Sequence, residues 1–244
     1  MSADQAQERV TGVAEGCVGG GSSIEPSECA VRVATAGVML EGDLFVPEGA
    51  SGLVLFAHGS GSSRHSPRNR YVARFLQQAG LATLLIDLLT LAEERVDLRT
   101  AQFRFDIELL GERLVGTTDW LVSQPATRDL RIGYFGASTG AAAALIAAAE
   151  RPELIGAVVS RGGRPDLAGP VLPRVRAPTL LIVGGHDFPV IRMNEEAFGQ
   201  LRTEKQLRIV PGATHLFEEP GTLEKAAELA HDWFRQYLGP KGAS

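Results

Sequence analysis

The chain of 244 residues lacks several features, and each absence excludes a class of protein. Two cysteines, Cys17 and Cys29, are too few for a disulfide scaffold, so we expect a reducing, cytoplasmic location. No apolar run is long enough to span a bilayer, and we expect no secretory signal in the first 23 residues. The chain has 24 Lys and Arg against 29 Asp and Glu, a net charge of −5. Because it has no excess of positive charge, we expect neither nucleic acid nor membrane as a partner.

Patterns for cofactors are missing too. No set of His, Cys or carboxylate residues has the spacing of metal ligands, so we expect no metal and no cofactor. The glycine-rich segment His58-Gly59-Ser60-Gly61 could be a phosphate loop, but it lacks the Lys-Ser/Thr ending of a P-loop and the glycine spacing of a dinucleotide site. We therefore favour another role for this segment.

The hydrophobic content of 44% is ample for one large core. Residues 1–25, which include the run Gly19-Gly20-Gly21-Ser22-Ser23, predict a disordered tail. We expect residues 26–244 to form a single α/β domain. The sequence leaves the oligomeric state open.

Apolar periodicity predicts the fold. Alternation in residues 30–34 and 38–46 predicts two antiparallel edge strands, and continuous apolar runs predict buried strands at 52–57, 81–86 and 132–135. Three further strands are predicted at 155–160, 179–183 and 206–210. Helical patterns lie between them, at 67–79, 103–121, after 138, at 195–201 and at 222–238, with a loop at 93–97. This alternation predicts a doubly wound, mostly parallel eight-stranded sheet with helices on both faces. The connection 161–178 is too short for a cap domain.

The segment Gly136-Ala137-Ser138-Thr139-Gly140 follows an apolar strand and leads into an alanine-rich helix. In this context Gly-x-Ser-x-Gly is typical of a nucleophile elbow, in which the serine hydroxyl points out of a tight turn. The alternative is an ordinary strand-to-helix turn in which Ser138 only caps the helix. An acid and a histidine later in the chain favour the nucleophile.

Asp187 and His215 supply that acid and that histidine, each just after a predicted strand. A carboxylate that orients a histidine makes it a general base for serine, and the chain order Ser, Asp, His fits. Asp166, after the preceding strand, is the rival acid. The backbone amides of Ser60 and Thr139 are the candidate oxyanion donors.

The chain from about residue 29 to 238 resembles an α/β-hydrolase, and within that superfamily the dienelactone-hydrolase-like group. The motifs that carry the resemblance are Gly136 to Gly140, His58 to Gly61, Gly184-Gly185-His186-Asp187 and Gly212 to Phe217. Dienelactone hydrolases use cysteine where this chain has Ser138. The resemblance with a serine implies an esterase that works through an acyl-enzyme. A thioesterase or acyltransferase is the alternative enzyme, and a catalytically silent interaction domain is the alternative of another class.

Two arginine clusters follow strands at the same sheet edge: Arg64 with Arg68 and Arg70, and Arg161 with Arg164. Guanidinium groups bind carboxylates and phosphates through paired hydrogen bonds. We therefore take Arg64, Arg161 and Arg164 as candidate substrate-binding residues and expect a small-molecule ester with an anionic group. The alternative is that these arginines pair with acids of the chain: Glu93, Glu94, Asp97 or Asp106.

Overall fold

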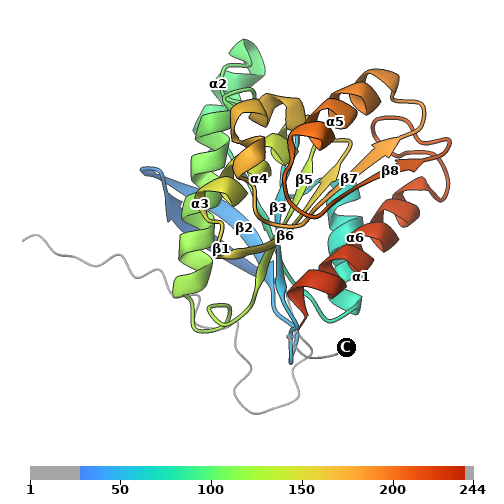
Figure 1. Cartoon of the computed structure of the whole chain (residues 1–244). Coiled ribbons are helices and arrows are strands. Elements are labelled where there is room, and N and C mark those ends of the chain that lie inside the picture. Colours follow the sequence, from blue (N-terminus) through green and yellow to red (C-terminus); the bar gives the residue numbers. More distant parts are fainter. Residues whose placement is uncertain (1–27, 240–244) are drawn as a thin grey trace, which may run out of the picture.

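The computed structural model describes residues 28–239 (Figure 1). The predicted tail, residues 1–25, lies outside the described residues. Among the described helices, none is long and apolar enough to cross a membrane. Cys29 is disulfide-bonded. The low cysteine count therefore does not by itself favour a reducing compartment, and the cytoplasmic location stays a prediction.

The described chain forms one eight-stranded sheet with the strand order β1-β2-β4-β3-β5-β6-β7-β8. The strands are β1 (Cys29–Thr35), β2 (Val38–Phe45), β3 (Leu53–Ala57), β4 (Ala82–Ile86), β5 (Ile132–Ala137), β6 (Ile155–Arg161), β7 (Thr179–Gly184) and β8 (Lys205–Val210). The β1–β2 and β2–β4 pairs are antiparallel and the others are parallel. The predicted mostly parallel sheet with an antiparallel edge is confirmed.

Helices cover both faces of the sheet (Figure 1). One face carries α1 (Pro67–Gln78) and α6 (Thr222–Leu238), and the other carries α3 (Ile107–Ser123), α4 (Thr139–Glu150) and α5 (Phe188–Gln200). Each face has its own apolar cluster, because strands β3 to β7 are buried on both sides. Helix α4 is rich in alanine, and its small side chains allow it to pack closely on the sheet.

Three expectations about helices were wrong. The predicted loop at 93–97 lies inside helix α2 (Leu91–Thr100), which begins with a capping box between Thr90 and Glu93. Helix α3 does not include Phe103, because Asp106 caps it and it begins at Ile107. Helix α5 begins at Phe188, directly after Asp187, well before the predicted residue 195. Both Thr-x-x-Glu and Pro189 in a first helical turn are local signals that would have predicted these starts.

The connection from β6 to β7 carries a 3₁₀ helix, η1 (Pro165–Arg174). Helix η1 packs beside α4 and α5, and its Ala168 and Leu172 join the apolar cluster on that face. No cap domain is inserted in this connection, as the sequence predicts. The carboxyl ends of the parallel strands, and the loops that follow them, are therefore left uncovered by an insertion at this point.

Candidate active site

Ser138 stands at a sharp turn between β5 and α4. Its backbone has φ 51° and ψ −123°, a conformation that L residues rarely adopt and that costs on the order of 1–3 kcal/mol. Backbone hydrogen bonds hold the turn, since Ser138 N–H donates to the Arg161 carbonyl at 3.3 Å and Arg164 N–H donates to the Ser138 carbonyl at 3.0 Å. This is the strained geometry that a nucleophile elbow requires.

Glycines allow the turn to be this tight. A Cβ on Gly136 would lie 2.4 Å from Ala141 Cα, and a Cβ on Gly140 would lie 2.3 Å from the Ala57 carbonyl oxygen. A Cβ on Gly59 would lie 2.9 Å from the Cβ of Ser138. The elbow, α4 and the loop after β3 can approach one another only because these three positions have no side chain.

His215 and Asp187 come from the loops after β8 and β7. His215 Nδ1 lies 2.6 Å from Asp187 Oδ2, and the Asp187 side chain is 11% exposed. An ionised carboxylate can only accept, so Nδ1 carries the proton and Nε2 is left free to accept another. Asp166, the rival acid, instead accepts two hydrogen bonds from Arg164, at 2.9 and 2.7 Å.

Backbone contacts fix these two loops against each other. His186 N–H donates to the Ala213 carbonyl at 2.9 Å, and a Cβ on Gly184 would lie 2.5 Å from that same oxygen. Gly162, at the end of β6, has φ +51° and lies under the histidine: a Cβ there would be 3.1 Å from the His215 carbonyl oxygen. The position of the histidine is therefore set by backbone that tolerates little change.

The candidate oxyanion donors, Ser60 and Thr139, contact each other. Ser60 N–H donates to Thr139 Oγ1 at 3.0 Å, and the two hydroxyl oxygens lie 2.9 Å apart. The Ser60 hydroxyl also donates to the Arg104 carbonyl at 3.3 Å. In this arrangement the Ser60 amide already has a partner within the protein, so its role as an oxyanion donor stays a prediction that requires Thr139 Oγ1 to move aside.

His58, which also follows β3, has a structural position. The Leu88 N–H donates to His58 Nε2 at 3.0 Å, so Nδ1 carries the proton and donates to the Gly59 carbonyl at 3.0 Å. Burial lowers the pKa of His58. A neutral imidazole with both nitrogens bonded holds the loop and is not available as a base.

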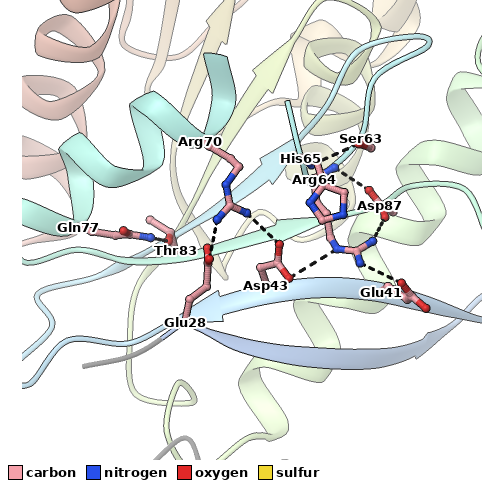
Figure 2. A network of polar contacts seen from close by, with 10 residues as sticks. All are labelled: Glu28, Glu41, Asp43, Ser63, Arg64, His65, Arg70, Gln77, Thr83 and Asp87. Atoms are coloured by element: carbon pink, nitrogen blue, oxygen red, sulfur yellow. Dashed lines mark hydrogen bonds and ion pairs between the residues drawn. The ribbon is translucent and has the colours of Figure 1, made fainter. Parts of the chain in front are cut away.

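The arginines separate into paired and unpaired groups. Figure 2 shows Arg64 between Glu41, Asp43 and Asp87. In the same network Arg70 lies between Glu28 and Asp43. Arg164 is paired with Asp166. These three have structural partners, although not the acids that the sequence suggested: Glu93 pairs with Arg113, Asp97 pairs with Arg104, and Asp106 caps α3.

Arg161 differs from them. It lies with Ser138 and His215 in the wall of a cavity of about 200 Å³, to which the loop after β3 and the first turn of α1 also contribute. Ser66, which caps α1, and Asn69 of its first turn are lining residues that the sequence analysis did not name. A Ser-Pro pair at 66–67 is the local signal for the helix start that places them there. In residues 28–239 no group of three His, Cys, Asp or Glu side chains is placed to hold a metal ion.

Comparison with known proteins gives consistent matches. The dienelactone hydrolase family profile matches residues 68–240. A dienelactone hydrolase from Anabaena variabilis is 66% identical with a TM-score of 0.87, and the match covers 88% of this chain and all, 100%, of that one. Est1E from Butyrivibrio proteoclasticus is 16% identical with a TM-score of 0.71, over 85% of this chain and 98% of that one. The latter similarity shows the fold alone.

The curated relatives that match this chain are not named as hydrolases. A protein of Mycobacterium tuberculosis, named "Putative phosphoribosyl transferase", is 59% identical over 215 residues. The match covers 87% of this chain and 48% of the relative. The chain thus spans about half the length of the curated relatives it matches.

Proposed function

Because the chain belongs to the dienelactone hydrolase family, we propose that it hydrolyses carboxylic esters through an acyl-enzyme formed on Ser138. The observation that supports this most is the 2.6 Å contact between His215 Nδ1 and Asp187 Oδ2 beside the cavity that Ser138 lines. A histidine that is oriented by a carboxylate and lines the same cavity as an elbow serine is the arrangement that can activate a hydroxyl.

In the proposed reaction His215 Nε2 takes the proton of Ser138 Oγ as the oxygen attacks the acyl carbon. Asp187 stabilises the imidazolium that forms. The imidazolium then gives its proton to the leaving alcohol oxygen, which leaves the acyl group on Ser138. A water molecule loses a proton to His215 and attacks the acyl carbon, and Ser138 regains its proton as the acid is released.

Charge builds on the carbonyl oxygen in both steps. Thr139 is the first residue of α4, so its amide lies at the positive end of the helix dipole. The first amides of a helix also have no hydrogen-bond partner within it. We propose the Thr139 amide as one oxyanion donor. We propose the Ser60 amide as the second, released from Thr139 Oγ1 when substrate binds.

A thioesterase or acyltransferase would use the same residues and differ in the bond cleaved or in the acceptor. The transferase name belongs to relatives about twice as long as this chain, whereas the hydrolase profile lies within it. We therefore assign hydrolysis to this chain.

The test is a fluorophosphonate probe together with a panel of matched esters and thioesters. We expect the probe to label Ser138 and the Ser138→Ala variant to lose labelling and about a million-fold in kcat, as for other serine nucleophiles. Ser123→Ala is the matched control, because Ser123 is an exposed residue at the end of α3. Turnover of Ser138→Ala close to the wild-type rate would refute the mechanism, and faster cleavage of thioesters would move the assignment to a thioesterase.

A further inference from the structure

The cavity beside Ser138 contains a buried cation without a counter-ion. Arg161 is 5% exposed, and no carboxylate of the described residues lies within 4 Å of its guanidinium. Its Nε has no hydrogen-bond partner, and its Nη2 donates to Asn69 Oδ1 only over a long distance of 3.4 Å. Its guanidinium carbon lies 5.6 Å from the centre of the Phe217 ring.

Such an arrangement is unfavourable unless a ligand completes it, because a buried charge without a partner loses its hydration and gains little in return. The chain does pair its other deeply buried arginine: Arg113 donates to Glu93 and to the Leu88 carbonyl. Burial and the neighbouring Arg68 lower the pKa of Arg161 to about 10, so the group still carries its charge at neutral pH. Arg161 is thus a retained charge in the wall of the proposed active site.

The surroundings of Arg161 are also positive. The first turn of α1 lines the same cavity through Ser66, Arg68 and Asn69, and it contains no acidic residue. A helix N-terminus carries partial positive charge and favours anions. Glu218 pairs with Arg68 at 3.2 Å, but that carboxylate is 63% exposed, so solvent screens the pair.

The other ionisable groups nearby do not neutralise Arg161. His215 lines the cavity, and the Asp187 carboxylate faces His215 Nδ1. Ser62 and Ser66 add hydroxyl groups that can donate to an anion. The guanidinium comes from the end of β6, and the hydroxyls and the helix N-terminus come from the continuous stretch 62–69, so donors face one space from two sides. A phosphate, with several oxygens in a tetrahedral arrangement, can accept from both sides at once.

We infer that this cavity is a subsite for a phosphate group carried by the substrate, held chiefly by Arg161 with Arg68 and the first turn of α1. The inference rests on the proposed function, because it places the phosphate beside the ester that Ser138 attacks. It narrows the anionic substrate expected from the sequence to one chemical class, and it excludes Arg64 and Arg164, whose charges are already paired.

The first experiment compares kcat/KM for three matched esters that carry a neutral group, a carboxylate or a phosphate monoester at the same position. We expect the phosphate ester to be preferred at low salt and the preference to shrink at high salt. In Arg161→Met the preference should fall roughly 10- to 100-fold, the range for losing hydrogen bonds to a charged group. Arg176→Met, which removes an exposed arginine paired with Glu153, should leave it unchanged.

The second experiment measures binding without turnover, by titrating inorganic phosphate into the Ser138→Ala protein and following the melting temperature and the heat of binding. We expect phosphate to raise the melting temperature and to inhibit hydrolysis of the phosphate ester competitively in the wild type. Arg161→Met should abolish the rise in melting temperature when it is added to Ser138→Ala, and it should abolish the inhibition by phosphate when it is made in the wild type. If that variant does not fold, Arg68→Met replaces it, with a smaller loss expected because Glu218 already shares the charge of Arg68.

The outcomes separate the two proposals. An equal gain for the carboxylate and phosphate esters, or no phosphate binding to Ser138→Ala, overturns the subsite and leaves ester hydrolysis standing. Phosphate binding that depends on Arg161, without any preference for the phosphate ester, overturns the substrate assignment in favour of free phosphate. Binding that depends on Arg161 in a protein that cleaves none of the esters supports the site and refutes the proposed hydrolysis.

Discussion

Replacement of Asp187 by Asn tests the contact on which the proposed mechanism most depends. Asn has nearly the same shape, so the loop after β7 should keep its backbone, including the hydrogen bond from residue 187 N–H to the Gly184 carbonyl at 3.0 Å. What changes is the hydrogen bond of 2.6 Å between His215 Nδ1 and Asp187 Oδ2. An amide nitrogen facing Nδ1 would force the proton onto Nε2, and the imidazole could then no longer accept the serine proton.

The expected loss is about 10⁴-fold in kcat, the size seen when the tautomer is wrong and the geometry survives. At 1.36 kcal/mol for each factor of ten, this corresponds to about 5.5 kcal/mol of transition-state stabilisation. KM should change little, since the Asp187 side chain contacts His215 and is not among the residues that line the cavity. Steady-state hydrolysis of an activated ester measures both parameters.

Asp166→Asn is the matched control. Asp166 is the rival acid from the sequence, but its carboxylate binds Arg164 and not the histidine. We expect kcat within about two-fold of the wild type, because a partly exposed ion pair contributes little. If Asp187→Asn keeps more than a tenth of the wild-type kcat, or if Asp166→Asn loses as much, the assignment of the acid is refuted.

Two further predictions concern stability. Gly140→Ala places a Cβ 2.3 Å from the Ala57 carbonyl oxygen and 2.5 Å from that of His58. Chemical denaturation should therefore show that the free energy of unfolding falls by about 1–3 kcal/mol. Gly169→Ala, whose Cβ would have nothing within 4 Å, should change it little. Burial alone would raise the pKa of Asp97, but hydrogen bonds from the Arg104 and Phe103 amides and from the Arg104 side chain lower it. Because the pKa of Asp97 in the folded state lies below its unfolded value near 3.8, ionised Asp97 stabilises the fold above that pH. This stabilisation is lost as the pH falls through the folded-state pKa. Asp97→Asn should therefore lower the melting temperature at pH 7, and the difference from the wild type should shrink below about pH 4; a difference that stays constant with pH would contradict the role of this charge.

Local patterns determined most of the fold. The apolar runs of the central strands are long enough to specify burial on both faces, and their alternation with helices specifies parallel pairing. The elbow was readable because the spacing of Gly136, Ser138 and Gly140 reflects a steric requirement of the turn itself. Local signals also specify the starts of two helices: Thr90 and Glu93 form the capping box of α2, where the patterns predicted a loop, and Pro189 lies in the first turn of α5, which begins before the predicted residue 195.

Pairing between distant segments was decided only by the tertiary structure. Asp166 and Asp187 both follow strands, and only the folded loops show that Asp187 faces His215, 28 residues further along the chain. Arg64, Arg161 and Arg164 likewise look alike in the sequence, but Arg64 and Arg164 meet carboxylates while Arg161 is buried without one. The sequence determines where charges lie along the chain and near which sheet edge. Whether a charge is neutralised depends on contacts of a few ångströms between side chains from separate elements, and these distances exist only once the sheet and its loops have packed.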